Sequence, residues 1–387
     1  MKFISIGTID IKFLIPVVGG LVGLIYRIFI VKSPKLGIIK QNPFLRSMYV
    51  TFGMILALIP LLIIKYKSKV GNDGQIIKSE YLKQLKDSKD AIKKTKCKKF
   101  RFILYSTIFD FLQTLLISLV YFVYNLWIFD IIIMSLFSFL ILKTKYYKHQ
   151  FISMIFIIIL GFGLNIIAYF KFDKTGDVIK SFSTLMQFIS EISVCLMVVI
   201  MKYNMEKNYC NPYELCFWEG VFGFILNLIF LVIFCQFEIS LYGIKHPDNL
   251  IKYFNEYDYN DFIVCLSIIA FYFLLDLSII LTCNYFTPIH TLIISIINET
   301  FRHLIPDSNS NFILNILSII ILFLITIMFL VFIEVIEINI CNLSYNTKRN
   351  IELRSKTDVL IEFEAGSFVI NEPELDEQTE RNIESSI

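Results

Sequence analysis

An acid, a base and an amide occur together in an otherwise apolar stretch, IHTLIISIINETFRHLIP (289–306). If this stretch is a helix, Asn298, Glu299 and Arg302 share one face, because they follow Thr291 and Ser295 at helical intervals. A carboxylate and a guanidinium in such a setting can neutralise each other, or they can bind an ion, a proton or a charged solute. The residues alone leave both alternatives open for Glu299 and Arg302.

Charged side chains recur in other apolar stretches. Each charge at the centre of a bilayer costs about 2.5–3.5 kcal/mol, so seven of them oppose insertion by roughly 20 kcal/mol unless they are paired or hydrated. A polar cavity shared by several helices would remove this cost, and we predict that these charged residues, with Gln113 and Asn298, bind solute or ions. The seven are Arg27, Asp110, Asp130, Glu191, Asp276, Glu299 and Arg302.

Helical spacing supports a shared cavity. Polar or small residues recur at intervals of three and four in three further apolar segments, so each segment presents a polar stripe. Ser and Thr in such stripes can instead bond to their own helix backbone. The stripes are Ser106, Asp110, Gln113 and Thr114; Ser183, Gln187, Ser190 and Glu191; and Gly19, Gly23, Tyr26 and Arg27.

Composition identifies the environment of these residues. Of 387 residues, 56% are apolar and 16% are aromatic, and mean hydropathy is +0.67. A water-soluble protein could not hide so much apolar surface, so the chain is an integral membrane protein. The cysteines lack CxxC spacing and the histidines lack metal-ligand spacing, so we expect no metal site and no cofactor. Nothing resembles a catalytic motif, and an enzyme is not expected.

The fold expected is all-α, with ten transmembrane helices, because a span needs about 20 apolar residues. The predicted spans are 11–31, 44–64, 102–119, 123–142, 151–170, 183–201, 217–235, 262–282, 288–305 and 312–333. Lys and Arg concentrate in 65–101, 143–148, 202–207 and 348–356, which predicts that these segments and both termini face the cytosol.

Connection lengths divide the chain into two halves of five helices each, 11–170 and 171–345. In each half only a few residues join the third and fourth spans, at 120–122 and at 283–287. Because five is odd, the halves would have opposite orientations, which is an inverted repeat. Outside the halves we predict a short cytosolic N-terminus (1–10), a basic cytosolic loop (65–101) and an acidic, disordered cytosolic tail (346–387).

Glycines predict where helices approach closely. Gly19 and Gly23 lie in the first span, and Gly220 and Gly223 follow Glu219 at the start of the seventh. Small residues at these positions suit either static close packing or helices that rock against each other, and both alternatives remain open.

The segment NPYELCFWEGVFGFILNLIFLVIF (211–234), with FDFLQT (109–114) and the stretch 135–164, resembles the nucleotide-sugar-transporter-like solute carriers. These belong to the drug/metabolite transporter superfamily, which includes EamA-like proteins, and the likeness is closest to the F-type branch of solute carrier family 35. The resemblance implies two inverted five-helix halves around a central cavity, with spans 5 and 10 outside and available for a homodimer. By position, the residues that best match the family's motif positions are Asp110, Gln113, Glu219, Gly220, Glu299 and Arg302, and we group Glu219 with the helix-packing residues Gly19, Gly23, Gly220 and Gly223.

These observations predict a secondary-active transporter that moves a small polar metabolite by alternating access, with coupling to protons as an open option. Carriers of nucleotide sugars typically carry Lys near spans 7 and 9, whereas 284–303 has none. The seven charged residues named above comprise five acids and two bases, which favours a cation, a zwitterion or a proton. The alternatives are a nucleotide-sugar antiporter and a non-transporting scaffold or trafficking factor. The resemblance implies an endomembrane location (Golgi, endoplasmic reticulum, or lysosome or vacuole), and no nucleic-acid partner is expected.

Overall fold

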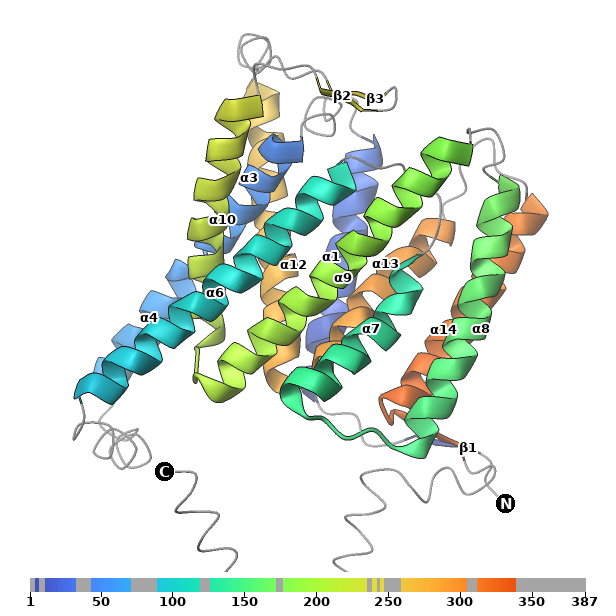
Figure 1. Cartoon of the computed structure of the whole chain (residues 1–387), viewed down its shortest axis with the longest axis horizontal. Helices are drawn as coiled ribbons and strands as arrows, with labels where there is room; N and C mark the ends of the chain where they lie inside the picture. The colour runs from blue at the N-terminus through green and yellow to red at the C-terminus, as the bar shows by residue number, and fades with distance from the viewer. Residues whose placement is uncertain are drawn as a thin grey trace, which may run out of the picture.

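The computed structural model describes residues 4–6, 11–32, 43–70, 89–118, 126–171, 177–234, 239–241, 244–246, 259–304 and 312–338. Most of these residues form helices that lie side by side in one bundle (Figure 1). The predicted tail (346–387) and residues 71–88 of the basic loop lie outside the described residues. The longer helices are α1 (Leu14–Lys32), α3 (Pro43–Ile55), α4 (Leu58–Val70), α6 (Lys89–Ser118), α8 (Lys148–Lys171), α9 (Asp177–Lys207), α10 (Pro212–Phe234), α12 (Tyr259–Tyr285), α13 (Leu292–Leu304) and α14 (Phe312–Phe332).

Six helical segments are long and apolar enough to cross a membrane: Ser47–Ile64, Lys148–Ile167, Phe182–Lys207, Pro212–Val232, Cys265–Tyr285 and Ile313–Phe332. Three shorter helical segments, Ile11–Ile25, Asp130–Leu142 and Pro288–Asn298, are also apolar. The prediction of a multi-pass helical membrane protein is therefore confirmed at this level. The number of ten spans stays a prediction.

The helix over 43–70 is interrupted between α3 and α4, close to Pro60. Proline has no backbone N–H and cannot bond to the carbonyl four residues earlier. The chain here uses tighter bonds, from Leu56 N to Gly53 O (3.0 Å) and from Ala57 N to Met54 O (3.0 Å). The interruption lies in the segment that we predicted as a single second span.

The predicted fourth and ninth spans both begin with a turn of 3₁₀-helix. Leu126–Phe129 (η4) precedes the short helix α7 (Asp130–Phe137), and Pro288–Thr291 (η6) precedes α13. α7 continues into a turn of π-helix, Ser138–Leu142 (η5), which ends at Lys143 in a left-handed conformation (φ 57°). Such irregular turns inside helices occur frequently at functional sites.

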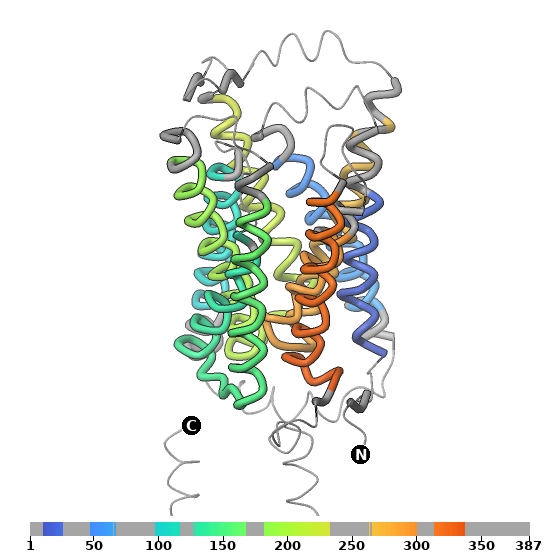
Figure 2. The backbone as a smooth tube through the Cα atoms, turned by 90° about the vertical axis from the view of Figure 1, so that its right-hand side faces the viewer, coloured from blue at the N-terminus to red at the C-terminus, as the bar shows by residue number. Residues whose placement is uncertain are grey.

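Helix contacts define the interior of the bundle. α6 packs against α9 and α10, and α3 packs against α10 and α12. α1 packs against α12 and α13, whereas α7 packs against α9. α8 and α14 pack against each other at one edge, which Figure 2 shows from the side.

Two short strand pairs lie at opposite ends of the bundle. β1 (Ile4–Ile6) pairs antiparallel with β4 (Ile336–Ile338), so the two ends of the helical region meet. β2 (Ile239–Leu241) pairs with β3 (Ile244–His246) at the other end (Figure 1). The termini of the bundle therefore share one side, as expected if both face one compartment. Which compartment that is stays a prediction.

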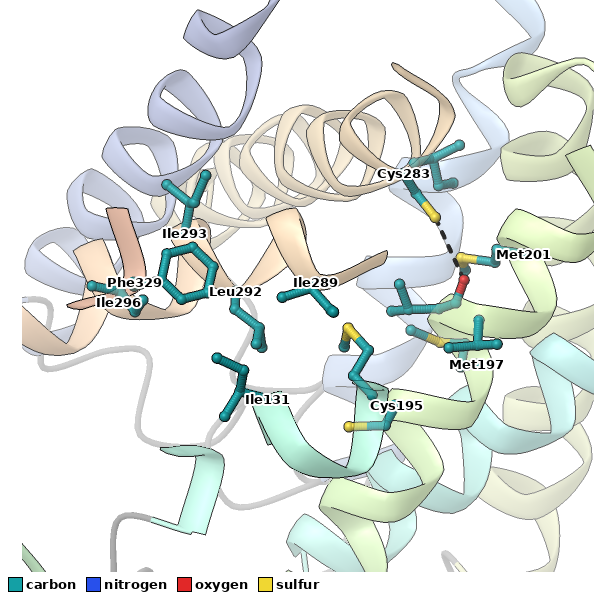
Figure 3. Close-up of a cluster of buried hydrophobic side chains, with 14 of the residues drawn as sticks. Ile131, Cys195, Met197, Met201, Cys283, Ile289, Leu292, Ile293, Ile296 and Phe329 are labelled. Atoms are coloured by element: carbon teal, nitrogen blue, oxygen red, sulfur yellow. Dashed lines mark hydrogen bonds between the residues drawn. The ribbon is translucent and has the colours of Figure 1, made fainter. Parts of the chain in front are cut away.

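The apolar core lies between the helices. Figure 3 shows one part of it, where Ile131 of α7, Cys195 and Met201 of α9, Cys283 of α12 and Leu292 of α13 converge. The outer faces of α8 and α14 are apolar and exposed, for example Phe323 at 62% and Ile159 at 60%. Side chains of this kind suit contact with acyl chains, and the predicted homodimer through these helices stays a prediction.

Candidate functional site

The predicted site residues lie on five interior helices. α6 carries Asp110 and Gln113, and Asp130 is the first residue of α7. Glu191 lies on α9, Asp276 on α12 and Asn298 on α13. The side chains of Arg27, Glu299 and Arg302 lie outside the described part of the structure, so the suggested pairing of Glu299 with Arg302 stays a prediction.

Some hydroxyl groups on these helices bond to nearby helix backbone. In the predicted stripes, the Thr291 hydroxyl donates to Pro288 O (2.7 Å), and outside them the Thr282 hydroxyl donates to Ser278 O (2.6 Å). This is the structural alternative left open by the sequence, and it accounts for these hydroxyl groups. The case for a site therefore depends on the carboxyl groups.

Asp130 and Glu191 form the first group of carboxyls, where α7 packs against α9. The Asp130 side chain is 3% exposed and hydrogen-bonds to that of Glu191. The Cys195 thiol donates to the backbone carbonyl of Asp130 (3.8 Å). Two carboxyl groups can share a hydrogen bond only if one of them carries a proton, because an ionised carboxylate only accepts. This pair is chemically suited to hold a proton inside the bundle.

Asp110, Glu219 and Asp276 form the second group, from α6, α10 and α12. The Glu219 carboxyl interacts electrostatically with those of Asp110 and Asp276, and the Asp276 carboxyl interacts with that of Asp110. The Ser106 hydroxyl donates to Glu219 Oε1. Glu219 is 3% exposed, and its Oε2 atom is buried without a hydrogen-bond partner among the described residues.

The described basic side chains do not neutralise this second group. Lys99 Nζ lies 2.5 Å from Glu214 Oε2, and Lys202 Nζ lies 3.2 Å from Glu206 Oε1, both at the cytosolic end predicted from the sequence. The structure describes no Lys or Arg ion pair with Asp110, Glu219 or Asp276. Buried carboxylates need a compensating charge or donor, and a solute or proton can supply it.

Glycines bring the helices that carry these groups close together. A Cβ atom on Gly220 of α10 would lie 2.8 Å from both Thr51 O and Ile55 N of α3. One on Gly23 of α1 would lie 2.6 Å from the amide nitrogen of Asn298, and one on Gly19 would meet the side chain of Ser278. The contacts fit the expectation of close packing but do not distinguish static from rocking helices.

Glu219 was grouped with the packing glycines from its position beside Gly220, but its carboxyl lies with those of Asp110 and Asp276. A sequence repeat relates α10, which carries Glu219, to α3. Segments 42–59 and 211–229 both begin with Asn-Pro and end with F-G-x-I-L-x-L-I. The repeat identifies α3 and α10 as copies of one element. The helices that pack on the two copies are therefore candidates for corresponding positions in the two halves.

A metal centre is not indicated. Within the described ranges, no three His, Cys, Asp or Glu side chains lie in an arrangement that could hold a metal ion. The site is therefore described by two groups of carboxyls and by the helices that bring them together. Comparison with protein-family models and with curated proteins found no match, so the resemblance to nucleotide-sugar-transporter-like carriers stays a prediction.

Proposed function

We propose that this chain is a secondary-active transporter that moves a small polar solute across a membrane and couples that movement to protons. The observation that carries the proposal is the group of carboxyls on α6, α7, α9, α10 and α12, in the interior of an apolar bundle. Intramembrane carboxyls are costly and mark the paths of ions, protons and solutes.

Packing between the helices supports alternating access. If the two five-helix halves are equivalent, α1 corresponds to α9, α3 to α10, α6 to α12, α7 to α13 and α8 to α14. Replacing each helix by its counterpart in the other half then predicts three equivalent contacts. The α6–α9 contact corresponds to α12–α1, the α6–α10 contact to α12–α3, and the α7–α9 contact to α13–α1. Each of these contacts and its counterpart is present. This pattern supports an inverted repeat, the architecture in which two halves rock about a central site.

The Asp130–Glu191 pair supplies the proton coupling in this proposal. A proton held between the two carboxyls would limit the pair to a single negative charge while the site faces neither compartment. Its release would leave two negative charges for a solute to compensate. The facing titratable groups that the structure describes around Asp130 are Glu191 and Cys195.

The basic end of the bundle is proposed to face the cytosol. It contains the start of α6, the end of α9 and the start of α10, which meet through the Lys99–Glu214 pair and through the bond from Asn204 Nδ2 to Lys99 O (3.4 Å). The linker from α7 to α8 adds Lys143, Lys145 and Lys148. Lys and Arg enrichment on one side is typical of cytosolic loops.

Reconstitution tests the proposal. Purified protein in liposomes that enclose a pH-sensitive dye is challenged separately with radiolabelled lysine, glycine, succinate, putrescine and UDP-glucose. We expect uptake of at least one cationic or zwitterionic solute with a matching proton flux. Uptake of every solute at the rate of empty liposomes would contradict transport of these classes.

Two variants separate transport from coupling. Glu191→Gln should abolish the proton flux that accompanies uptake, whereas Glu206→Gln, at an exposed position of the same helix, should not change it. Uptake by Glu191→Gln with unchanged pH dependence would exclude coupling at this pair and leave the transporter proposal intact.

A further inference from the structure

Asp110 and Asp276 lie on corresponding helices of the two predicted halves. Gly53 and Gly223 are the glycines of the repeated F-G-x-I-L-x-L-I segments in α3 and α10. A Cβ atom on Gly53 would lie 2.7 Å from Ile269 O and 3.1 Å from Phe273 N of α12, and one on Gly223 would lie 3.7 Å from Thr107 Cγ2 of α6. Asp276 follows Phe273 by three residues, and Asp110 follows Thr107 by three residues. Each aspartate therefore lies on the helix beside one repeated glycine, three residues beyond a residue near that glycine.

Glu219 adds an independent observation that points to a ligand. Its carboxyl interacts with both aspartates, and one of its oxygens is fixed by the Ser106 hydroxyl. The other oxygen is buried and has no hydrogen-bond partner in the described part of the chain, and the same holds for Asp276 Oδ2. Acceptor atoms in such a setting need donors, and the protein supplies none that the structure describes.

The spacing of the three carboxyls restricts the ligand class. They interact electrostatically but do not form a metal-sized cluster among the described residues. A bare metal ion would need its ligands within about 2.0–2.6 Å. An ammonium group has several N–H donors on one nitrogen, and charge-assisted bonds from it to carboxylates are among the strong ones. A second ammonium at the other end of a short chain can reach a second carboxyl.

We infer that Asp110, Asp276 and Glu219 form a binding site for a small organic amine, with a diamine as the best match to two equivalent carboxyls and a third between them. Binding at this site is independent of the proposed transport function, whereas its role as the substrate site rests on that function. Asp130 and Glu191 lie outside this site and hold the proton.

Calorimetry on the purified full-length chain tests the site, with putrescine as the probe. 1,4-Butanediol matches its length without charge, succinate reverses its charge, and magnesium chloride supplies a divalent metal. We expect putrescine to bind and the other three not to compete at tenfold excess. Equal competition by butanediol or by magnesium would overturn the inference, as would the absence of putrescine binding.

Variants then assign the binding. Asp276→Asn, Asp110→Asn and Glu219→Gln should each weaken putrescine binding at least tenfold, whereas Asp276→Glu should retain measurable binding. Glu206→Gln is the charge-matched control and should bind like the parent. Unchanged binding in all three carboxyl variants, with melting temperatures like that of the parent, would overturn the assignment.

Counterflow in liposomes distinguishes the two proposals. Putrescine binding without putrescine exchange would keep the site and contradict transport of this amine. Exchange of glycine or another solute without putrescine binding would keep the transporter and contradict the amine site.

Discussion

Carboxyl groups inside an apolar bundle are stable only when each oxygen has a donor or a proton. Glu219 illustrates this, because Ser106 satisfies one oxygen and the described protein leaves the other without a partner. Asp130 and Glu191 bond to each other, which requires a proton on one of them, and Asp130 Oδ1 is still buried without a partner among the described residues.

Removing the Ser106 hydroxyl should lower the free energy of unfolding, because the Glu219 carboxyl loses its hydrogen-bond donor. Ser106→Ala leaves both Glu219 oxygens without a described donor, and we expect a loss of stability of about 1–3 kcal/mol. Ser267→Ala is the matched control, because that hydroxyl bonds only to Ile263 O (2.8 Å) in an exposed setting, and it should change stability by less than about 0.5 kcal/mol. Denaturation of the detergent-solubilised variants measures both, and equal losses would contradict the role of Ser106.

Two cysteines near the basic end should differ in reactivity. Burial raises the pKa of the Cys210 thiol to about 12, so this thiol stays protonated at neutral pH, and the thiolate is the nucleophile. Cys97 is exposed. We expect N-ethylmaleimide at pH 7.5 to label Cys97 and to spare Cys210 in the native protein, as read by peptide mass spectrometry. Comparable labelling at both positions would show that Cys210 is not buried in this way.

At the scale of elements, α10 and α3 approach each other through Gly220. A methyl group there would collide with backbone atoms of α3 rather than with a mobile side chain. Gly220→Ala should therefore destabilise the protein by about 1–3 kcal/mol.

Gly163→Ala is the control for this substitution. A methyl group at Gly163 in α8 would lie 3.5 Å from Ile321 Cδ1, which is ordinary contact. Alanine favours a helix over glycine by about 1 kcal/mol, so this variant should be neutral or more stable. Thermal melts compare the two, and a Gly220→Ala variant as stable as Gly163→Ala would exclude tight α3–α10 packing.

Apolar length predicted the helices well but not their ends or interruptions. The predicted seventh span, 217–235, overlaps α10 (Pro212–Phe234) almost entirely. α6 instead begins at Lys89, well before the predicted start at 102, because a helix continues into its polar turns where hydropathy falls. Pro60 shows in the sequence that the helix can break nearby. The exact place of the break depends on which backbone carbonyls lose their helical hydrogen bonds, and the sequence does not reveal this.

The acidic residues of the site were found from the sequence, whereas their grouping was not. Charge inside an apolar segment identified Asp110, Asp130, Glu191 and Asp276. The grouping of the carboxyls depends on how α6, α10 and α12 pack against one another. Residue spacing within a single segment contains no information about this packing. Glu219 was placed with the glycines for the same reason, because its neighbour in sequence is Gly220 and its neighbours in space are aspartates.

At the scale of the whole molecule, ion pairs and an aromatic contact join the two predicted halves at the basic end. Lys99 of α6 pairs with Glu214 of α10, and the rings of Phe102 and Tyr203 lie 4.8 Å apart. His149 Nε2 lies 3.2 Å from Glu334 Oε1. A rocking motion that opens this end to the cytosol has to separate them.

The ion pair between the halves should therefore bias which end opens. Glu214→Lys places two like charges together, and we expect the buried Cys210 thiol to become more reactive toward a water-soluble maleimide, with the exposed Cys97 as the internal reference. The double exchange Lys99→Glu with Glu214→Lys restores the attraction and should return reactivity to the parent level. The pair is partly exposed and contributes only about 0–1 kcal/mol, so the melting temperature should change little. Equal reactivity in all three proteins would exclude this pair as part of a gate.

The pairing of β1 with β4 joins the first and last described segments of the chain. Residues 4–6 emerge from the ribosome long before residues 336–338 are synthesised. The first strand therefore remains unpaired while the intervening helices insert into the membrane. Only a chain extended beyond residue 338 can complete this sheet. A shorter chain would keep an unpaired strand edge, which is a ready template for pairing with another chain.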